Sequence, residues 1–409
     1  MKNNNGITIV ALVVTIVVLL ILAGVSINLV LGNNGVISKA KEAETKSGEA
    51  SENDLNGMNR LIDKMESLLG GDIEPETIPY LPSDDFHYDT STSVDTGLVI
   101  ADTDENEYVW VVVPKSLYNN TTYNSNNDKK PSSSTDYANI EYCLQQYTAT
   151  YRSKTRYSDV YYADDKNVGW FADETAYNNF KNSMLKSVYE NGGFYVGRYE
   201  AGIGTNRTSK SATNSDGKYT IEGMPAPVSK ADAYPYTYVT RTQAQNLASN
   251  VNSGTKTSSL MFGVQWDLVL KYLETKGTAQ ADLKEDSTSW GNYYNNLWNI
   301  TNANSKYAIL NTSNYTLGDW TSGAYGAKGS SSRILLSTGA SDTFSKQGIY
   351  DFAGNAWEWT LERTYDYRVY CVYRGGAYDY DGNRCSAAYR TYNIPNTLDN
   401  NMSFRVSLF

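Results

Sequence analysis

Residues 351–360 read DFAGNAWEWT and predict a tight turn followed by a strand. Gly354 and Asn355 both adopt positive φ readily, which a tight turn requires. The two tryptophans that follow alternate with Glu358, as expected for a strand that buries one aromatic face. We expect these residues to be structural rather than catalytic.

Three arginines further along the chain have the same structural character. Arg374 precedes the pair Gly375-Gly376, which allows a close backbone approach while the guanidinium bridges strands with its several donors. Arg390 and Arg405 are likewise expected to reach inward.

The rest of the C-terminal region predicts strands, turns and a few helices. Residues 94–114 predict two strands around an Asp-Glu-Asn turn, and residues 193–202 predict another strand. Apolar residues at helical spacing predict helices at 171–193, 240–251 and 260–277. From there to the C-terminus strands and turns dominate, so the expected class is α+β with irregular, loop-rich β structure.

Composition excludes several classes of function. The chain has 409 residues, 35 of them tyrosines, and a formal net charge of −10. The attraction to phosphate that drives nucleic-acid binding is therefore missing, and Lys129-Lys130 is the only basic run. We expect no nucleic acid as partner.

Cysteine and histidine are scarce. Cys143, Cys371 and Cys385 allow at most one disulfide. The single histidine, His87, excludes multi-histidine iron or zinc sites and leaves Ser-His-Asp catalysis dependent on that one residue. His87 lies in an acidic, turn-like stretch, so we interpret it as an ordinary surface residue.

The N-terminal part predicts a membrane anchor. Residues 7–31 are apolar and uncharged, and at about 1.5 Å per residue they are long enough to cross a hydrocarbon core of about 30 Å. A charged amphipathic helix completes the segment 7–69, and residues 70–84 have the Pro, Gly and acid content of a linker. Residues 85–409 then form the main domain, with an expected surface insertion at about 115–165 that is rich in Ser, Thr, Asn and Tyr.

This beginning, MKNNNG followed by an apolar run, resembles a type IV prepilin or pseudopilin. The resemblance implies a leader at residues 1–6, cleavage after Gly6 and a mature chain that starts at Ile7. That family usually has Glu at the fifth mature position, where this chain has Ala11. Two alternatives stay open: assembly with other pilin subunits, and simple membrane anchoring.

The main domain resembles the formylglycine-generating-enzyme (sulfatase-modifying factor) family, a variant of the C-type lectin fold. The resemblance covers about residues 85–409 and rests on these segments: EYVWVVV (107–113), GFYVGRYEAG (193–202), PVSK (227–230), LMFGVQWD (260–267), GIYDFAGNAWEWT (348–360), RGGAY (374–378), AAYR (387–390) and SFRVSLF (403–409). It implies a C-type lectin-like fold of the formylglycine-generating-enzyme type, preceded by the long pilin-like helix.

The chemistry of that family does not carry over. Its enzymes bind copper with a pair of cysteines, of which Cys385 matches the second and Tyr380 stands at the first. Soft copper(I) requires two thiolates for tight linear ligation. Cys371 lies outside the motif, and the histidines of the iron-dependent relatives are missing. We therefore expect no enzymatic activity and interpret Cys385 as a buried small hydrophobe.

A non-enzymatic branch of the same fold fits RGGAYDYDGNRCSAAYR (374–390) better: the variable proteins of diversity-generating retroelements. In that family mutagenesis falls on adenines, so AAC-type codons diversify while scaffold codons are spared. The residues at matching positions are Asp379, Tyr380, Asp381, Asn383, Tyr389, Tyr392 and Asn393, and we add Tyr365, Asp366, Tyr367 and Tyr370. Rigid aromatic anchors mixed with short polar groups are what a contact surface uses.

The sequence thus predicts a surface protein that is membrane-anchored or pilus-associated, with an extracellular C-terminal domain. Its face at 365–400 is expected to bind a protein or glycan on another cell or phage. The alternatives are a formylglycine-generating-type oxidase, a structural minor pilin without a ligand, and a fixed protein whose loops merely face solvent. No cofactor is expected, although relatives of this fold carry structural calcium, for which spacing assigns no ligands here.

Overall fold

The computed structural model describes residues 79–152, 157–161, 171–206, 220–251, 257–364 and 371–409. Several predictions lie outside these residues: the leader with Gly6 and Ile7, the helical segment 7–69, most of the linker 70–84, and the site residues Tyr365, Asp366, Tyr367 and Tyr370. In the part of the chain that is described, no helix is both long enough and apolar enough to cross a membrane. Residues 79–409 form one compact unit.

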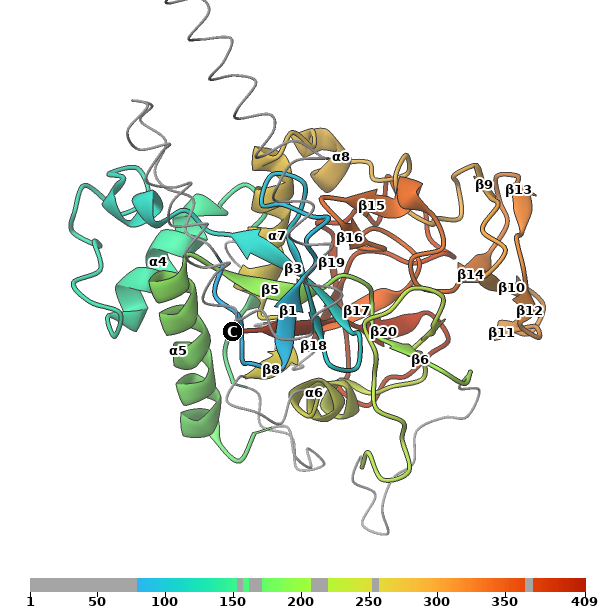
Figure 1. Cartoon of the computed structure of the whole chain (residues 1–409), viewed down its shortest axis with the longest axis horizontal. Coiled ribbons are helices and arrows are strands. Elements are labelled where there is room, and N and C mark those ends of the chain that lie inside the picture. Colours follow the sequence, from blue (N-terminus) through green and yellow to red (C-terminus); the bar gives the residue numbers. More distant parts are fainter. Residues whose placement is uncertain (1–78, 153–156, 162–170, 207–219, 252–256, 365–370) are drawn as a thin grey trace, which may run out of the picture. The chain divides into compact units, whose positions relative to one another are not determined.

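The larger sheet has six strands in the order β1-β2-β3-β5-β21-β8, with all neighbours antiparallel. The strands are β1 Phe86–Tyr88, β2 Val99–Asp102, β3 Glu107–Val112, β5 Gly193–Gly197, β8 Ser258–Leu260 and β21 Val406–Leu408. The predicted hairpin at 94–114 is confirmed, and Glu105 makes its turn with φ 60°. The chain ends inside this sheet, because β21 lies between β5 and β8 (Figure 1).

The second sheet has the order β19-β18-β17-β20, and β4 also pairs with β17. Its strands are β4 Tyr157–Ser158, β17 Trp357–Thr364, β18 Cys371–Arg374, β19 Arg390–Asn393 and β20 Met402–Phe404. The predicted turn at Gly354-Asn355 is confirmed, since both residues have positive φ, 76° and 56°. β17 is buried on both faces, not on one, because Glu358 is as inaccessible as the tryptophans beside it.

Short strands form the remaining β structure. β10 Lys306–Asn311 pairs with β11 Thr316–Leu317, β12 Thr321–Ser322 and β14 Ile334–Leu336. The other pairs are β6 Gly202–Ile203 with β7 Tyr234–Pro235, β9 Trp298–Ile300 with β13 Gly326–Lys328, and β15 Ser345–Lys346 with β16 Ile349–Tyr350. Figure 1 shows β9 to β14 gathered at the end of the domain opposite α4 and α5.

The three predicted helices are confirmed as α5 Glu174–Asn191, α6 Arg241–Ser249 and α7 Gly263–Thr275. A carboxylate oxygen of Asp173 accepts a hydrogen bond from the Ala176 amide at 2.8 Å and caps α5, which ends at Gly192 with φ 74°. Two further helices are α4 Tyr137–Tyr147 and α8 Gln280–Lys284, and the short 3-10 turns are η1 Lys115–Asn119 and η2 Asp342–Phe344. The domain therefore has the mixed α and β structure that was expected.

The expected surface insertion at 115–165 is partly a packed element. Helix α4 lies within it and contributes Ile140, Cys143 and Leu144 to the main core. Lys181 of α5 pairs with Glu141 of α4 at 3.0 Å. This part of the insertion is thus integrated into the domain.

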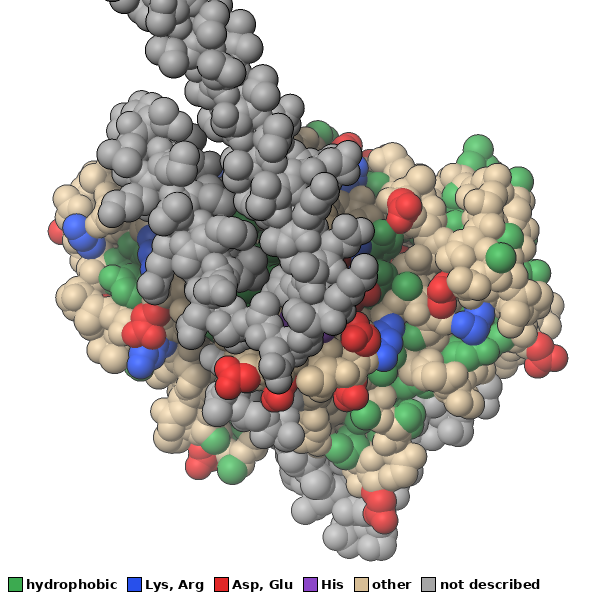
Figure 2. Space-filling model, in the orientation of Figure 1, with side chains coloured by type: hydrophobic (Ala, Val, Ile, Leu, Met, Phe, Trp, Pro, Cys, Tyr) green, Lys and Arg blue, Asp and Glu red, His purple; other side chains and the backbone are tan. Residues whose placement is uncertain are grey.

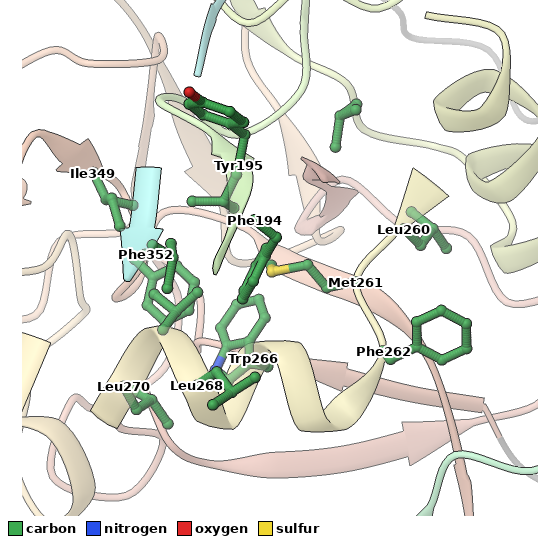
Figure 3. Packing of buried hydrophobic residues seen from close by; sticks show 14 of the residues in the cluster. Phe194, Tyr195, Leu260, Met261, Phe262, Trp266, Leu268, Leu270, Ile349 and Phe352 are labelled. Atoms are coloured by element: carbon green, nitrogen blue, oxygen red, sulfur yellow. The ribbon is translucent and has the colours of Figure 1, made fainter. Parts of the chain in front are cut away.

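Helix α7 lies at the centre of the core. Trp266 stacks on Phe352 with 4.1 Å between ring centroids, and Figure 3 shows it close to Phe194 and Met261. Its Nε1–H donates to the carbonyl of Ala387 at 3.0 Å, which ties α7 to the C-terminal loop. On the face drawn in Figure 2, the visible basic side chains lie singly among acidic ones.

Because Asp159 and Asp351 are buried, we expect the stability of the folded protein to fall as pH rises, which is the reverse of the usual effect of carboxyl groups. Burial raises the pKa of Asp351 to about 7 and that of Asp159 to about 6. In the unfolded chain an aspartate ionises near pH 4, so between about pH 4 and 7 the unfolded state binds fewer protons. The free energy of unfolding then falls as pH rises through this window.

We therefore expect a higher urea midpoint at pH 5 than at pH 8. Asp351→Asn, which keeps an acceptor for the Gly339 amide, is expected to reduce that difference, whereas Asp84→Asn at an exposed position is not. Urea titrations of the three proteins at both pH values check this. A midpoint that rises from pH 5 to pH 8 in the parent chain would contradict the assignment.

Candidate ligand-binding face

The loop from Arg374 to Arg390 begins with a backbone that only glycine fits. Gly375 and Gly376 have φ 92° and 85°. A Cβ atom on Gly376 would lie 2.3 Å from the carbonyl oxygen of Cys385 and 2.5 Å from the ring of Tyr293. The glycine pair therefore lets two parts of the loop approach each other, as its sequence predicts.

The two arginines at the ends of this loop share two buried carboxylates. Arg374 donates to Asp267 of α7 at 3.0 Å and contacts Glu362 of β17 at 3.5 Å. Arg390 donates to the other oxygen of Asp267 and lies 3.0 Å from Glu362. Burial, together with the charge of Arg390, lowers the pKa of Arg374 to about 10. The prediction of inward-reaching arginines is confirmed, and the network clamps the loop to a helix and a strand.

Arg405, which lies between β20 and β21, is the third of the buried structural arginines. Its Nε and Nη2 atoms bind the Glu358 carboxylate at 2.6–3.1 Å, and both side chains are buried. Burial raises the pKa of Glu358 above its usual value. This bidentate pair explains why β17 is inaccessible on both faces.

Backbone hydrogen bonds fix the middle of the loop. The amide of Tyr380 donates to the carbonyl of Ala377 at 3.0 Å, and the carbonyl of Tyr380 accepts from the Tyr294 amide at 2.8 Å. The amide of Gly382 donates to the side-chain oxygen of Asn295 at 3.0 Å. Beyond it, the Ala388 amide donates to the carbonyl of Leu283 in α8 at 2.9 Å. The loop is thus held along most of its length.

Cys385 belongs to this frame rather than to a reactive centre. It is 6% exposed and forms no disulfide, which confirms the interpretation as a buried small residue. Burial raises the pKa of its thiol to about 12, and that of Cys143 to about 11. The Cys371 sulfur lies 3.1 Å from Nη1 of Arg241 on α6. All three cysteines are buried, and none of them is part of a disulfide.

These environments predict unreactive thiols. At pH 8 we expect fewer than one thiol per folded chain to react with Ellman's reagent within an hour, because reaction requires an accessible thiolate. In urea all three are expected to react. Rapid reaction of a thiol in the folded chain that Cys385→Ser abolishes would contradict the structural role of Cys385.

Two exposed tyrosines rest on a buried tryptophan. The Tyr380 and Tyr389 rings lie 5.3 and 6.1 Å from that of Trp357, which is 2% exposed. Tyr373 of β18 also packs on Trp357, at 5.1 Å. The side chains of Tyr380 and Tyr389 are nevertheless 44% and 42% exposed. Burial raises the pKa of Tyr380 to about 12, so its hydroxyl stays protonated and can donate at neutral pH.

The polar site residues differ in how strongly they are already hydrogen-bonded and buried within the protein. The Asp379 carboxylate accepts from Nδ2 of Asn401 at 3.1 Å, and burial raises its pKa. Asn383 is exposed and lies 3.5 Å from the Asn295 amide, and Asp381 is half-buried. Asn383 and Asp381 are therefore the better placed for contact with a ligand.

Strand β19 divides the remaining site residues between two sides of the sheet. Thr391 pairs with Tyr373, whereas Tyr392 pairs with Val372. Because side chains alternate along a strand, Asn393 shares the side of Thr391, and Tyr392 lies on the opposite side with Arg390. Tyr392 instead packs near Tyr157 of β4, with ring centroids 6.5 Å apart. The predicted residues thus form one main group around Trp357 and a separate position at Tyr392.

An open groove of about 720 Å³ lies on the side of Arg390. Its lining includes Tyr151, Arg152, Tyr157, Lys284, Tyr389 and Arg390, so Tyr389 borders both the groove and the group around Trp357. The sequence interpretation missed Tyr373, Thr391 and the groove residues other than Tyr389 and Arg390. For Tyr373, the one signal in the sequence that could have identified it is its position among buried neighbours in residues 371–374. We use the name "the aromatic face" for Tyr373, Tyr380, Asp381, Asn383, Tyr389, Thr391 and Asn393.

Over the described ranges, no group of three or more His, Cys, Asp or Glu side chains is placed to hold a metal ion. Copper ligation of the family type does not fit the residues present, since Tyr380 stands where the other thiol would be and tight linear copper(I) ligation requires two thiolates.

Similarity to known proteins covers the aromatic face. Residues 104–408 match the family model described as "Sulfatase-modifying factor enzyme 1-like domain". No curated protein matches the chain significantly. Among solved structures, the chain is similar to CarF (TM-score 0.28, 16% identity, 53% of this chain and 85% of that one). It is also similar to Treponema denticola variable protein 1 (TM-score 0.24, 12% identity, 80% of this chain and 99% of that one).

Proposed function

Because the chain belongs to the family of sulfatase-modifying factor enzyme 1-like domains, we propose that it is a non-enzymatic member that binds a ligand through the aromatic face. The ligand is a protein or glycan on another cell or phage. Residues 7–31 anchor the chain in the membrane, alone or with other pilin subunits, and the C-terminal domain is displayed at the cell surface.

One observation carries this proposal: Tyr380 and Tyr389 are more than 40% exposed although the frame beneath them is fixed. Both rings pack against the buried Trp357, and the backbone of Tyr380 is hydrogen-bonded at its amide and its carbonyl. Aromatic side chains that are already ordered lose little entropy on binding, which is why they act as anchors in contact surfaces.

The donor set argues against the oxidase alternative. Tight copper(I) ligation needs two thiolates, and the motif positions offer a phenol at Tyr380 and a single thiol at Cys385. The other two thiols lie on different elements, Cys143 on α4 and Cys371 on β18. Binding, rather than cysteine oxidation, is the function that these residues support.

The pattern of exposure also agrees with the resemblance to variable proteins of diversity-generating retroelements. The spared positions Arg374, Gly376, Cys385 and Arg390 make the frame, through ion pairs and close packing. Of the seven described positions that match diversified ones, Tyr380, Asn383 and Tyr389 are exposed and the other four are half-buried. Substitution at these seven positions would change contacts while sparing the core.

Deep sequencing of the gene and its neighbouring DNA in a growing population tests the proposal. We expect a near-identical template repeat beside a reverse-transcriptase gene, with substitutions only at adenines. The variable codons should include those of Tyr380, Asn383 and Tyr389, and the codons of Arg374, Cys385 and Arg390 should stay constant. Absence of a template, with no excess of substitutions in these codons, would remove the variable-protein proposal.

A further inference from the structure

A second cavity lies beside residues 399–401. It has a volume of about 500 Å³ and is lined by Asn206, Tyr238, Thr316, Leu317, Gly318, Asp319 and Trp320. Such a volume is within the range of about 300–1,000 Å³ that is typical of small-molecule sites. We call it the Trp320 cavity.

Hydrogen bonds of the 399–401 segment locate this cavity. The Asn400 side-chain amide donates to the carbonyl of Tyr315, which precedes the lining residue Thr316, and the Asn401 side-chain amide donates to the carboxylate of Asp379. The amide of Tyr238 donates to the carbonyl of Asp399 at 2.9 Å. None of the residues that line the cavity belongs to the aromatic face or to the groove at Arg390.

Contacts with neighbouring side chains fix the Trp320 ring in the wall of the cavity. The Trp320 ring meets Tyr234 edge to face, with 4.9 Å between centroids and 86° between planes. Trp320 also packs on a small buried cluster that contains Leu310 and Leu335. The indole is therefore held in place before any ligand arrives.

Two polar groups at the cavity have no partner among the residues that the structure describes. The Trp320 Nε1–H is buried without an acceptor, although an indole N–H can only donate. The Asp319 carboxylate is exposed, forms no ion pair within the described ranges and can only accept. A ligand that satisfies both groups must offer acceptors and donors together.

The backbone of Tyr238 is a second, independent sign of a site. It has φ 55°, a left-handed conformation that is unusual for a bulky side chain. Such conformations cost of order 1–3 kcal/mol and cluster at ligand sites and switches. The bond to Asp399 holds this conformation, and the side chain lines the cavity.

From these observations we infer that the Trp320 cavity binds one sugar ring of a glycan. Hydroxyl groups both donate and accept, so they satisfy Asp319 and the Trp320 N–H, and the C–H face of a sugar ring packs on an aromatic ring. No lysine or arginine lines the cavity among the described residues, so an anionic ligand would lack a counter-charge. A wholly apolar ligand would leave the two polar groups unpaired.

Saturation-transfer NMR on the full chain with methyl glycosides of glucose, galactose, mannose and N-acetylglucosamine tests this inference. We expect at least one to bind with millimolar affinity. Asp319→Ala, at an exposed position, is expected to weaken binding at least tenfold, and Trp320→Phe, which keeps a ring but removes the N–H, about threefold to tenfold. Leu297→Ala, at an exposed position outside both the cavity and the aromatic face, is the control and should leave the signal unchanged.

The inference fails if none of the four glycosides binds, or if binding survives Asp319→Ala and Trp320→Phe unchanged. It also fails if these two variants alter binding of a displayed peptide library but of no saccharide. Because Asp319→Ala removes no packed group, loss of folding does not obscure the result. The test is independent of the aromatic face, since Tyr380 and Tyr389 do not line this cavity.

Discussion

Replacing Arg374 by alanine is expected to lower the free energy of unfolding by about 3–5 kcal/mol, the cost of leaving buried charges without a partner. The guanidinium is fully buried and contacts Asp267 and Glu362. Arg390 also binds these two carboxylates, but it balances only one of the two charges. Urea unfolding monitored by circular dichroism checks the value.

Two further variants sharpen this result. Arg374→Lys keeps the charge but loses the planar fork that reaches both carboxylates, so we expect it to recover only a part of the stability. Arg384→Ala, at an exposed position of the same loop, is expected to change stability by less than about 0.5 kcal/mol. Equal urea midpoints for Arg374→Ala and Arg384→Ala would contradict the role of Arg374 in holding the loop to α7 and β17.

The second large effect is expected on binding. Tyr380→Ala and Tyr389→Ala should each weaken ligand binding by about 2 kcal/mol or more, or about 30-fold, as buried aromatic anchors do at the centre of an interface. Both side chains are partly exposed, so stability should change by much less than in Arg374→Ala. Biolayer interferometry with the full chain measures the loss.

Two control variants separate the loss of ligand contacts at the aromatic face from a general effect of changing the surface. Leu297→Ala removes a large apolar group that is 71% exposed and lies outside the aromatic face, so its affinity should equal that of the parent chain. Tyr392→Ala tests whether the two sides of β19 contribute differently to binding. Its loss of affinity should be smaller than that of Tyr389→Ala because Tyr392 lies on the other side of the sheet. Equal losses in all four variants would argue against a defined face.

The frame could be predicted from the sequence because its signals are local. Gly354 and Asn355 take the positive φ that their residue types favour, and Arg374 and Cys385 are buried as expected. An arginine beside a glycine pair and a lone cysteine followed by Ser386 and two alanines have few other ways to be accommodated. Local chemistry was sufficient for these positions.

Features that depend on distant partners could not be predicted. Glu358 is buried because Arg405, far along the chain, neutralises it. Helix α4 has only three buried apolar residues in a stretch rich in polar ones, so its helical pattern is weak. The side on which Tyr392 lies depends on the register between β18 and β19, and the sequence RTYN (390–393) has no apolar alternation that would set it.

Hydrogen exchange of the full chain, free and bound to a ligand selected on intact cells or phage, tests the central claim most directly. Binding at the aromatic face predicts slower exchange of amides between Tyr380 and Asn393 and in β18. The predicted slowing should be absent in a Tyr380→Ala, Tyr389→Ala double variant at the same ligand concentration. Protection confined to other parts of the domain, with exchange at 380–393 unchanged, would contradict the assignment of this face as the binding site.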